Sequence, residues 1–418
     1  MTAVQSAMAW LVRSPARAFV VIFVVGFSVR ATVLRWVPRE YISPHTRWEV
    51  EAVAVSLAQR GAFADPYVIP TGPTAHVPPA YPALLSIVYR TFGLTYAAGV
   101  VVWMLAAAYG AATFALLPWF AGKVGVARQA GLLGGLAGAA LPHWLAHAEA
   151  LTALVLCLLL AAFVRRWTAM RASAGASLLL GLVWGAAFHL KPALLPVLLG
   201  CMAFELWWLR GRRPWRASAL MTLGVLTACA PWTWRNYTTF HRLMFVRSNF
   251  GLELRVGNHD GATADIDVNA QRRTFRHPRT SEPEAAEVRD LGEAGYMQQE
   301  RREALSWIAE HPGRFAELTG TRFLYFWLGP LHRSAAALWI TLLTVLAAVG
   351  LWRSFPTMAA PQRAALLIPL LTFPAVYYLL AYMVRYRIPI EWILFLLAGA
   401  GVWHGIAGRT AEGPEAGR

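Results

Sequence analysis

Long apolar runs without charges recur along almost the whole chain, and they constrain the fold more than any other feature. They are roughly 17–22 residues long, which is the length that an α-helix needs to cross the ~30 Å hydrocarbon core of a bilayer. Only 14% of the 418 residues are charged, whereas a soluble chain carries about 25%. The runs do not alternate between polar and apolar residues, as the strands of a membrane barrel do. The sequence therefore predicts an all-α polytopic membrane protein.

We expect about ten transmembrane helices of this length. Their approximate limits are 18–37, 95–118, 129–142, 150–164, 174–189, 192–208, 217–233, 335–352, 364–383 and 388–406. Another apolar stretch, 80–92, is too short to cross comfortably and is typical of an interfacial or re-entrant helix. Most arginines of the short loops fall where the positive-inside rule predicts the cytoplasm. Both termini are then cytoplasmic, and we expect a multi-pass protein of the plasma or inner membrane.

This topology divides the chain into four parts. They are a transmembrane module at 1–235 with a first outer loop at 38–94, an extracytoplasmic segment at 236–330, the last transmembrane helices at 331–408 and a cytoplasmic tail at 409–418. We expect the extracytoplasmic segment to be small and mixed. It should combine a short β-like piece at 243–258, an amphipathic helix near 293–310 and an aromatic-rich helix at 313–328.

The net charge of +16 does not indicate a nucleic-acid partner. The basic residues fall mostly in short clusters between spans, and the others lie on the outer side, where an anionic substrate explains them better. The cysteines Cys157, Cys201 and Cys229 lie within apolar runs and have no metal-binding spacing, so we expect buried free thiols. The first apolar run lacks a small-residue cleavage site, and we interpret it as a retained first span.

Two carboxylates, Glu49 and Glu51, follow the first span in the stretch "HTRWEVEAVAVSLAQRGAF". On a helix, residues two apart point about 200° away from each other. Both side chains therefore cannot enter one cleft, and at most one of them is expected to be catalytic. The alternative is a solvated interfacial helix that carries two acids without a chemical role.

Cationic side chains lie at matching outer positions of several spans. Lys191 stands at a junction between spans, where it either snorkels to the interface or contacts a phosphate. Arg235 lies in "PWTWRNY", and Arg385 and Arg387 lie in "MVRYRIP". Arginine forks match phosphate oxygens. Acids and cations at one membrane face fit transfer chemistry on a lipid-linked phosphate, with a carboxylate as general base and the cations stabilising the leaving group.

The outer turns hold further candidates. His76 lies in the stiff loop "PTGPTAHVPPAYP", where it is either a structural histidine or part of a pocket wall. His143, His147 and Glu149 have a spacing that suits Zn²⁺, but the preceding proline favours polar residues at the interface. Glu149 is alternatively a second acid that faces the first loop. We assign no metal, and a divalent ion stays open.

The chain resembles the C-type superfamily of integral-membrane glycosyltransferases. The similarity is to the family 39-like branch, which is related to protein O-mannosyltransferases and lipid A aminoarabinose transferases. It rests on segments in order along most of the chain: "WEVEAVAVSLAQRGAF", "PTGPTAHVPPAYPALLSIVYRTFG", the glutamate that opens the fourth span, "FHLKPALL", "PWTWRNYTTFHRLMFVRSNFGLELRVGN" and "RYRIPIEWILFLLA". The resemblance implies a GT-C fold.

The resemblance also implies a function. Such enzymes transfer a sugar from a polyprenyl-phosphate carrier to a protein, lipid or glycan acceptor at the extracytoplasmic face, usually with inversion. By this similarity Glu49 is the general base and Glu51 is a bystander, although relatives often have Asp-Glu here and the choice between the two stays open. The implied donor-phosphate residues are Lys191, Arg235, Arg385 and Arg387. The implied acceptor pocket holds His76, Tyr81, Glu149, His147 and Asn236.

Three other classes of protein remain alternatives, and one of them, a phosphoethanolamine-type or ligase-type enzyme, would use different nucleophiles. A flippase or transporter for a polyprenyl-phosphate lipid would need polar groups at the bilayer midplane and often paired repeats. Charges at midplane positions are scarce in this sequence and we find no repeat. A membrane scaffold without catalytic activity would tolerate the loss of either acid in the first loop.

Overall fold

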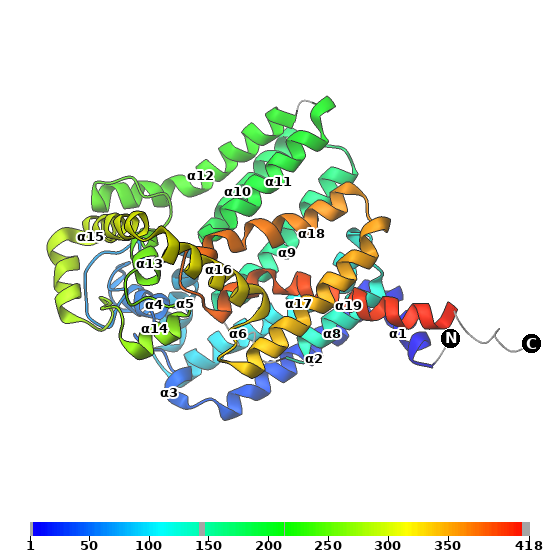
Figure 1. Ribbon diagram of the computed structural model, residues 1–418, viewed down its shortest axis with the longest axis horizontal. Coiled ribbons are helices and arrows are strands. Elements are labelled where there is room, and N and C mark those ends of the chain that lie inside the picture. Colours follow the sequence, from blue (N-terminus) through cyan, green and yellow to red (C-terminus); the bar gives the residue numbers. More distant parts are fainter. Residues whose placement is uncertain (1–2, 142–146, 213, 412–418) are drawn as a thin grey trace, which may run out of the picture.

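The computed structural model describes residues 3–141, 147–212 and 214–411, and it consists of helices joined by turns and loops (Figure 1). Within these ranges the only β-type pairings are two isolated bridges, Ala64 to Pro73 and Asp265 to Tyr382. The predicted all-α class is confirmed. The β-like piece predicted at 243–258 is wrong, because its second half forms helix α13 and its first half forms no strand.

Twelve of the mostly apolar helices run in chain order through the molecule. They are α1 (Ala3–Arg13), α2 (Pro15–Val33), α6 (Tyr96–Ala115), α7 (Leu117–Lys123), α8 (Arg128–Ala139), α9 (His147–Thr168), α10 (Ala174–Phe188), α11 (Leu195–Trp208), α12 (Pro214–Phe240), α17 (Ser334–Ser354), α18 (Ala360–Thr372) and α19 (Ile388–Ala411). The other α-helices are α3 (Arg39–Ile42), α4 (Glu49–Arg60), α5 (Ala80–Phe92), α13 (Phe250–Gly257), α14 (Ile266–Arg272), α15 (Glu282–Glu310) and α16 (Pro312–Leu328).

Several of these helices are long and apolar enough to cross a membrane. Among the described residues five such spans occur, at Pro15–Trp36, Tyr96–Lys123, Ala148–Thr168, Ser334–Thr357 and Val384–Ala407. Shorter apolar helices occupy Ala174–Phe188 and Pro192–Trp208. The chain is therefore a multi-pass membrane protein.

One predicted span, 364–383, is not a continuous helix. Helix α18 ends at Thr372, and a short 3₁₀ helix follows at Pro374–Tyr378. Pro374 has no N–H to continue the hydrogen-bond ladder of an α-helix. The chain then runs in irregular structure to a second 3₁₀ turn, Val384–Arg387, directly before α19. This break leaves the residues before α19 free to form part of a site.

Helix α13 is stabilised by the packing of its apolar residues against α15. Leu252 and Val256 are four residues apart and lie on one face, where they pack with Val288, Tyr296 and Met297 of α15. This small core holds the extramembrane helices together. Helix α15 itself bends at Gly292, which has a φ of 67° inside an otherwise helical segment.

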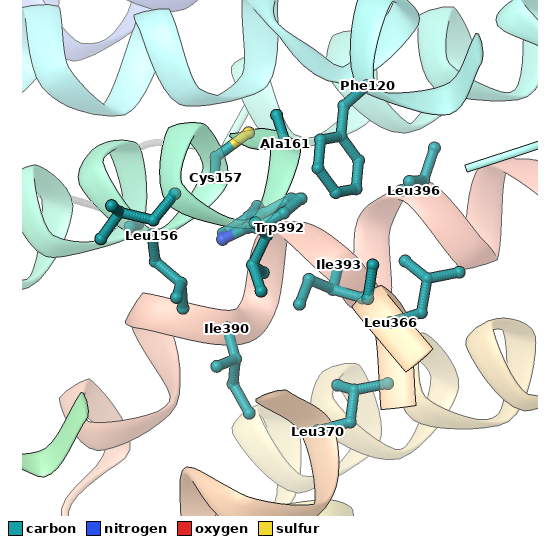
Figure 2. Packing of buried hydrophobic residues seen from close by; sticks show 14 of the residues in the cluster. Phe120, Leu156, Cys157, Ala161, Leu366, Leu370, Ile390, Trp392, Ile393 and Leu396 are labelled. Atoms are coloured by element: carbon teal, nitrogen blue, oxygen red, sulfur yellow. The ribbon is translucent and has the colours of Figure 1, made fainter. Parts of the chain in front are cut away.

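The main core surrounds helix α19. Figure 2 shows Trp392 of α19 between Leu156 and Cys157 of α9 and Phe120 of α7. The rings of Phe120 and Trp392 are 4.9 Å apart and nearly perpendicular, an arrangement that aromatic pairs favour. All three cysteines are buried and free, as predicted.

Small residues let α19 approach its neighbours closely. A Cβ atom on Gly134 of α8 would overlap the carbonyl oxygen of Phe395, and one on Gly350 of α17 would overlap that of Leu397. Close backbone approach through small residues is a common packing mode of membrane helices. Helices α8, α17 and α19 therefore form a tight frame.

The short helices gather at one end of the molecule. Helices α4, α5, α13 and α14 lie together there, whereas α1 and the end of α19 lie at the opposite end (Figure 1). Residues 38–94 and the start of the segment 236–330 thus share one end, in the arrangement that the topology predicts. The candidate site residues are found at this end.

Candidate functional site

A cavity of about 780 Å³ lies among the extramembrane helices. Its wall comes from three distant parts of the chain: Trp48 and Glu49 at the start of α4, residues between 253 and 281, and Arg385 with Tyr386 directly before α19. The break after α18 allows the last of these parts to reach the cavity. The cavity is large enough for a sugar and a phosphate group, since ligand sites typically measure about 300–1,000 Å³.

The cavity is rich in cations. Its lining includes the arginines Arg273, Arg276, Arg279 and Arg385, against only two carboxylates, Glu49 and Glu253. Four positive and two negative groups leave an excess of two positive charges. Trp48, Phe275 and Tyr386 add aromatic surface, which commonly packs against apolar faces of a ligand.

Glu49 is the carboxylate of the first loop that lines the cavity. It is the first residue of α4, where the helix dipole stabilises a negative charge. Its Oε1 lies 3.6 Å from Nη1 of Arg279, and the Glu49 side chain is 19% exposed. The Arg279 guanidinium in turn lies 5.1 Å from the ring centre of Trp48. This contact holds the carboxylate at the cavity wall while leaving it accessible.

Glu51 is not among the cavity-lining residues. Burial, with smaller contributions from Glu49 and Glu149, raises the pKa of Glu51 to about 7, although Arg385 acts in the opposite sense. Burial and then the Glu51 carboxylate also raise the pKa of Tyr89 on α5, so the Glu51 side chain lies toward that helix. The two acids therefore occupy different surroundings.

Lys191, Glu149 and Arg385 form a charged triad behind the cavity. Nζ of Lys191 donates to Oε1 of Glu149 at 3.2 Å, and Nε of Arg385 lies 3.9 Å from the same oxygen. Lys191 also lies 5.8 Å from the ring centre of Tyr386, which lines the cavity. The triad carries one net positive charge, and Glu149 orients both cations.

Arg235 and Asn236 stabilise the first outer loop rather than line the cavity. Arg235 donates to the carbonyl oxygens of Thr74 at 2.7 Å and Phe63 at 3.0 Å. Asn236 accepts from Arg235 at 3.1 Å and donates to the carbonyl oxygen of Met244 at 3.2 Å. The predicted phosphate ligand Arg235 and the predicted pocket residue Asn236 are therefore not among the residues that line the cavity.

Arg387 is also separate from the cavity. Residues two apart in a 3₁₀ turn point about 240° away from each other, so Arg385 and Arg387 face different sides. The Arg387 side chain is 1% exposed, lies 3.3 Å from Glu391 and donates to the carbonyl oxygen of Phe326 at 2.9 Å. It fastens α19 to α16, and only Arg385 of the predicted pair faces the cavity.

His76 supports the cavity wall from behind. Its Nδ1 lies 3.1 Å from the hydroxyl oxygen of Tyr67, and the Tyr67 ring meets the ring of His277 edge to face at 5.6 Å. His277 lines the cavity. Burial and the neighbouring Arg279 lower the pKa of His277 to about 4, so its imidazole is neutral at pH 7. Tyr81 is buried on α5.

The first outer loop is joined to α15 by a buried carboxylate. Glu293 accepts hydrogen bonds from the Thr74 hydroxyl, from the backbone N–H of Ala75 at 2.7 Å and from the Ser248 hydroxyl at 2.6 Å. The bend at Gly292 directly before it turns the carboxylate toward these donors. The loop and the helix are thus held in one position relative to the cavity.

The predicted zinc ligands fall only partly within the structure. His143 lies outside the described residues, and so does the side chain of His147. Glu149 pairs with Lys191. Over the part of the chain that the structure describes, no group of three His, Cys, Asp or Glu side chains has a geometry that would hold a metal ion.

The sequence interpretation missed the basic segment of the cavity wall. Arg273, Arg276, His277 and Arg279 come from "QRRTFRHPRT", which it treated only as part of a polar outer segment. The signal was present, because four arginines lie within ten residues of a segment that the predicted topology places outside, against the positive-inside rule. Charge clusters on the side where that rule does not place them indicate a binding site.

Comparisons with known proteins do not assign the chain to a family. No family model matches it, and no curated protein matches it.

Proposed function

We propose that the protein is a membrane glycosyltransferase that takes a sugar from a polyprenyl-phosphate donor at the extracytoplasmic face. One observation carries the proposal: Glu49 and Arg385, which are far apart in the sequence, line the same cavity. A carboxylate that accepts a proton and a cation that binds phosphate are the two groups that this transfer needs. The resemblance of the sequence to GT-C enzymes supports the same assignment.

In the proposed reaction Glu49 acts as the general base. Its carboxylate accepts the proton of an acceptor hydroxyl while that oxygen attacks the anomeric carbon of the sugar. The bond between this carbon and the phosphate oxygen breaks, and polyprenyl phosphate leaves with its bonding electrons. Attack from the face opposite the phosphate inverts the anomeric configuration. The acceptor gains the sugar, and Glu49 later releases its proton to water.

The cationic triad stabilises the leaving group. The phosphodiester of the donor carries one negative charge, and the released polyprenyl phosphate carries up to two. Arg385 is held by Glu149 at 3.9 Å, and Lys191 lies behind it, so the positive charge is in place before the bond breaks. Such preorganised charge typically contributes about 3–4 kcal/mol per group to transition-state stabilisation.

Glu51 is the alternative base, because the sequence leaves the choice open. A pKa of about 7 suits general-base chemistry at neutral pH. Its position toward α5, outside the cavity lining, argues for Glu49. Replacing each acid separately by glutamine distinguishes the two.

The test compares glycans and lipids of cells that lack the protein with those of complemented cells. Mass spectrometry should show one glycosylated species that disappears without the protein and returns with the wild-type chain. Glu49→Gln should fail to restore it, at equal protein level in the membrane. Glu40→Gln is the matched control, because Glu40 is an exposed acid on α3. Full restoration by Glu49→Gln would refute the assignment of the base and favour Glu51 or a non-catalytic scaffold.

A further inference from the structure

The arginine-rich wall of the cavity is a fixed structure. Asp265 is the N-cap of helix α14, and its carboxylate accepts a hydrogen bond from the N–H of Asp267 at 2.9 Å. Asp265 also lies 3.1 Å from both His332 and Arg333, which anchors α14 to the start of α17. The wall therefore has a firm attachment to the transmembrane helices.

The segment after α14 is held by its own backbone contacts. Arg273 has a φ of 51°, a left-handed conformation that is uncommon outside glycine and that clusters at functional sites. The N–H of Thr274 donates to the carbonyl oxygen of Asn269, and the N–H groups of Thr280 and Ser281 both donate to that of His277. These hydrogen bonds hold the backbone from which the arginine side chains project.

The arginines of this wall differ in their partners. Arg279 contacts Glu49 at 3.6 Å. Arg273 and Arg276 line the cavity and are exposed, and neither makes an ion pair with another described residue. The side chains of this wall are therefore available to a ligand from solvent or from the bilayer surface.

The positive charge exceeds what a single donor phosphate requires. The triad of Lys191, Glu149 and Arg385 already carries one positive charge, which matches the single negative charge of a phosphodiester. The arginine wall consists of Arg273, Arg276 and Arg279, and these residues are separate in the sequence from that triad. Glu253, the other lining carboxylate, has its own partner in Arg247 at 4.0 Å. Even if Glu49 neutralises Arg279, Arg273 and Arg276 therefore leave two further positive charges.

We propose that the Arg273–Arg279 wall binds a second phosphate group, carried by the acceptor, while the donor phosphate lies at Arg385. The proposal rests on the proposed function and names the substrate class of the same cavity: an acceptor that is itself a phosphate ester. Arginine forks bind phosphate oxygens in pairs. A phosphate anchored at this wall would place a neighbouring hydroxyl of the acceptor beside Glu49, which contacts Arg279.

The experiment uses the full-length protein in detergent micelles and isothermal titration calorimetry. Farnesyl phosphate serves as the probe of the donor site. Glycerol 3-phosphate and short-chain phosphatidic acid serve as water-soluble and lipid-borne probes of the second site, each titrated with and without saturating farnesyl phosphate. We expect at least one of them to bind together with farnesyl phosphate. The probe that binds identifies the source of the acceptor phosphate.

The double variant Arg273→Gln/Arg276→Gln should weaken binding of that probe by about tenfold or more, which corresponds to the loss of charge-assisted hydrogen bonds. Its affinity for farnesyl phosphate should change less than about twofold. Arg272→Gln is the matched control, because Arg272 is an exposed neighbour that does not line the cavity. Both replaced side chains are exposed, so we expect the Tm of the double variant to be unchanged. The Tm measurement serves as the control that the variant is folded.

Two results would overturn the proposal. One is that neither phosphate probe binds the wild-type protein while farnesyl phosphate is bound. The other is that the double variant loses farnesyl phosphate and the second probe to the same extent, which would assign the whole wall to the donor. If farnesyl phosphate does not bind at all, that result counts against the proposed function. The second site can still be judged in that case, because its probes are also titrated without farnesyl phosphate.

Discussion

The stability of the protein should depend on the ionisation of Glu51. Burial raises the pKa of this carboxyl from 4.5 to about 7 in the folded chain. The folded state then binds the proton more tightly than the unfolded state does. The stability contributed by the neutral carboxyl is fully present below pH 4.5 and is lost as the pH rises through about 7. Above this pH the ionised carboxylate destabilises the fold.

The size of the effect follows from the pKa difference. At about 1.4 kcal/mol per pKa unit, a rise from 4.5 to about 7 corresponds to about 3 kcal/mol. The side chain is not fully shielded from solvent, so we expect about 2–3 kcal/mol. Glu51→Gln should therefore change stability little at pH 5 and should stabilise the protein by about this amount at pH 9.

The assay is thermal unfolding in detergent across this pH range. The Tm of Glu51→Gln should exceed that of the wild-type chain by a margin that grows between pH 4.5 and about 7 and then stays constant at a few degrees. Glu40→Gln, which replaces an exposed acid on α3, should follow the wild-type curve. Parallel curves for Glu51→Gln and the wild-type chain would refute the reasoning, because they would mean that Glu51 titrates alike in the folded and unfolded states.

Three further predictions concern the packing of the apolar helices and the membrane topology of the chain. On α11, Glu205 accepts a hydrogen bond from the buried Arg166 of α9 at 2.8 Å. Glu205→Ala leaves Arg166 without this partner and should cost about 3–5 kcal/mol; an unchanged Tm would contradict this. Gly134→Leu should abolish the folded yield, because the new side chain would separate α8 from α19. Gly405→Leu should be tolerated, because nothing lies within 4 Å of the Cβ position of Gly405. Equal yields of the two variants would count against close packing at Gly134. An impermeant thiol reagent should label Val68→Cys in intact cells and Arg353→Cys only after permeabilisation, and the reverse pattern would invert the topology.

Much of the fold follows from local patterns in the sequence. The interfacial helix predicted at 80–92 matches α5, and the helix predicted at 313–328 matches α16 within one residue. Apolar composition and helical period determine such elements almost alone. The error at 243–258 has the same origin, because a short apolar run is ambiguous between strand and helix. Only packing against α15 decides that α13 is helical.

The candidate site was less predictable, because it depends on which way each side chain points. Arg385 and Arg387 are indistinguishable in sequence, yet one lines the cavity and the other fastens α19 to α16. Arg235 looks like a phosphate ligand until its carbonyl partners are seen. The arginine cluster at 273–279 is visible in the sequence, but no pattern there indicates that this segment meets Glu49. Long-range contacts of this kind are set by tertiary packing.

The wall of the cavity has a consequence for how the protein is made. Its three parts are synthesised at different times. Glu49 leaves the ribosome early, the arginine segment follows, and Arg385 emerges directly before helix α19. A nascent chain that ends before Arg385 has only part of the cavity wall. The half-made protein therefore has no complete binding site while it is still being threaded into the bilayer, and chains truncated before Arg385 are expected to be inert.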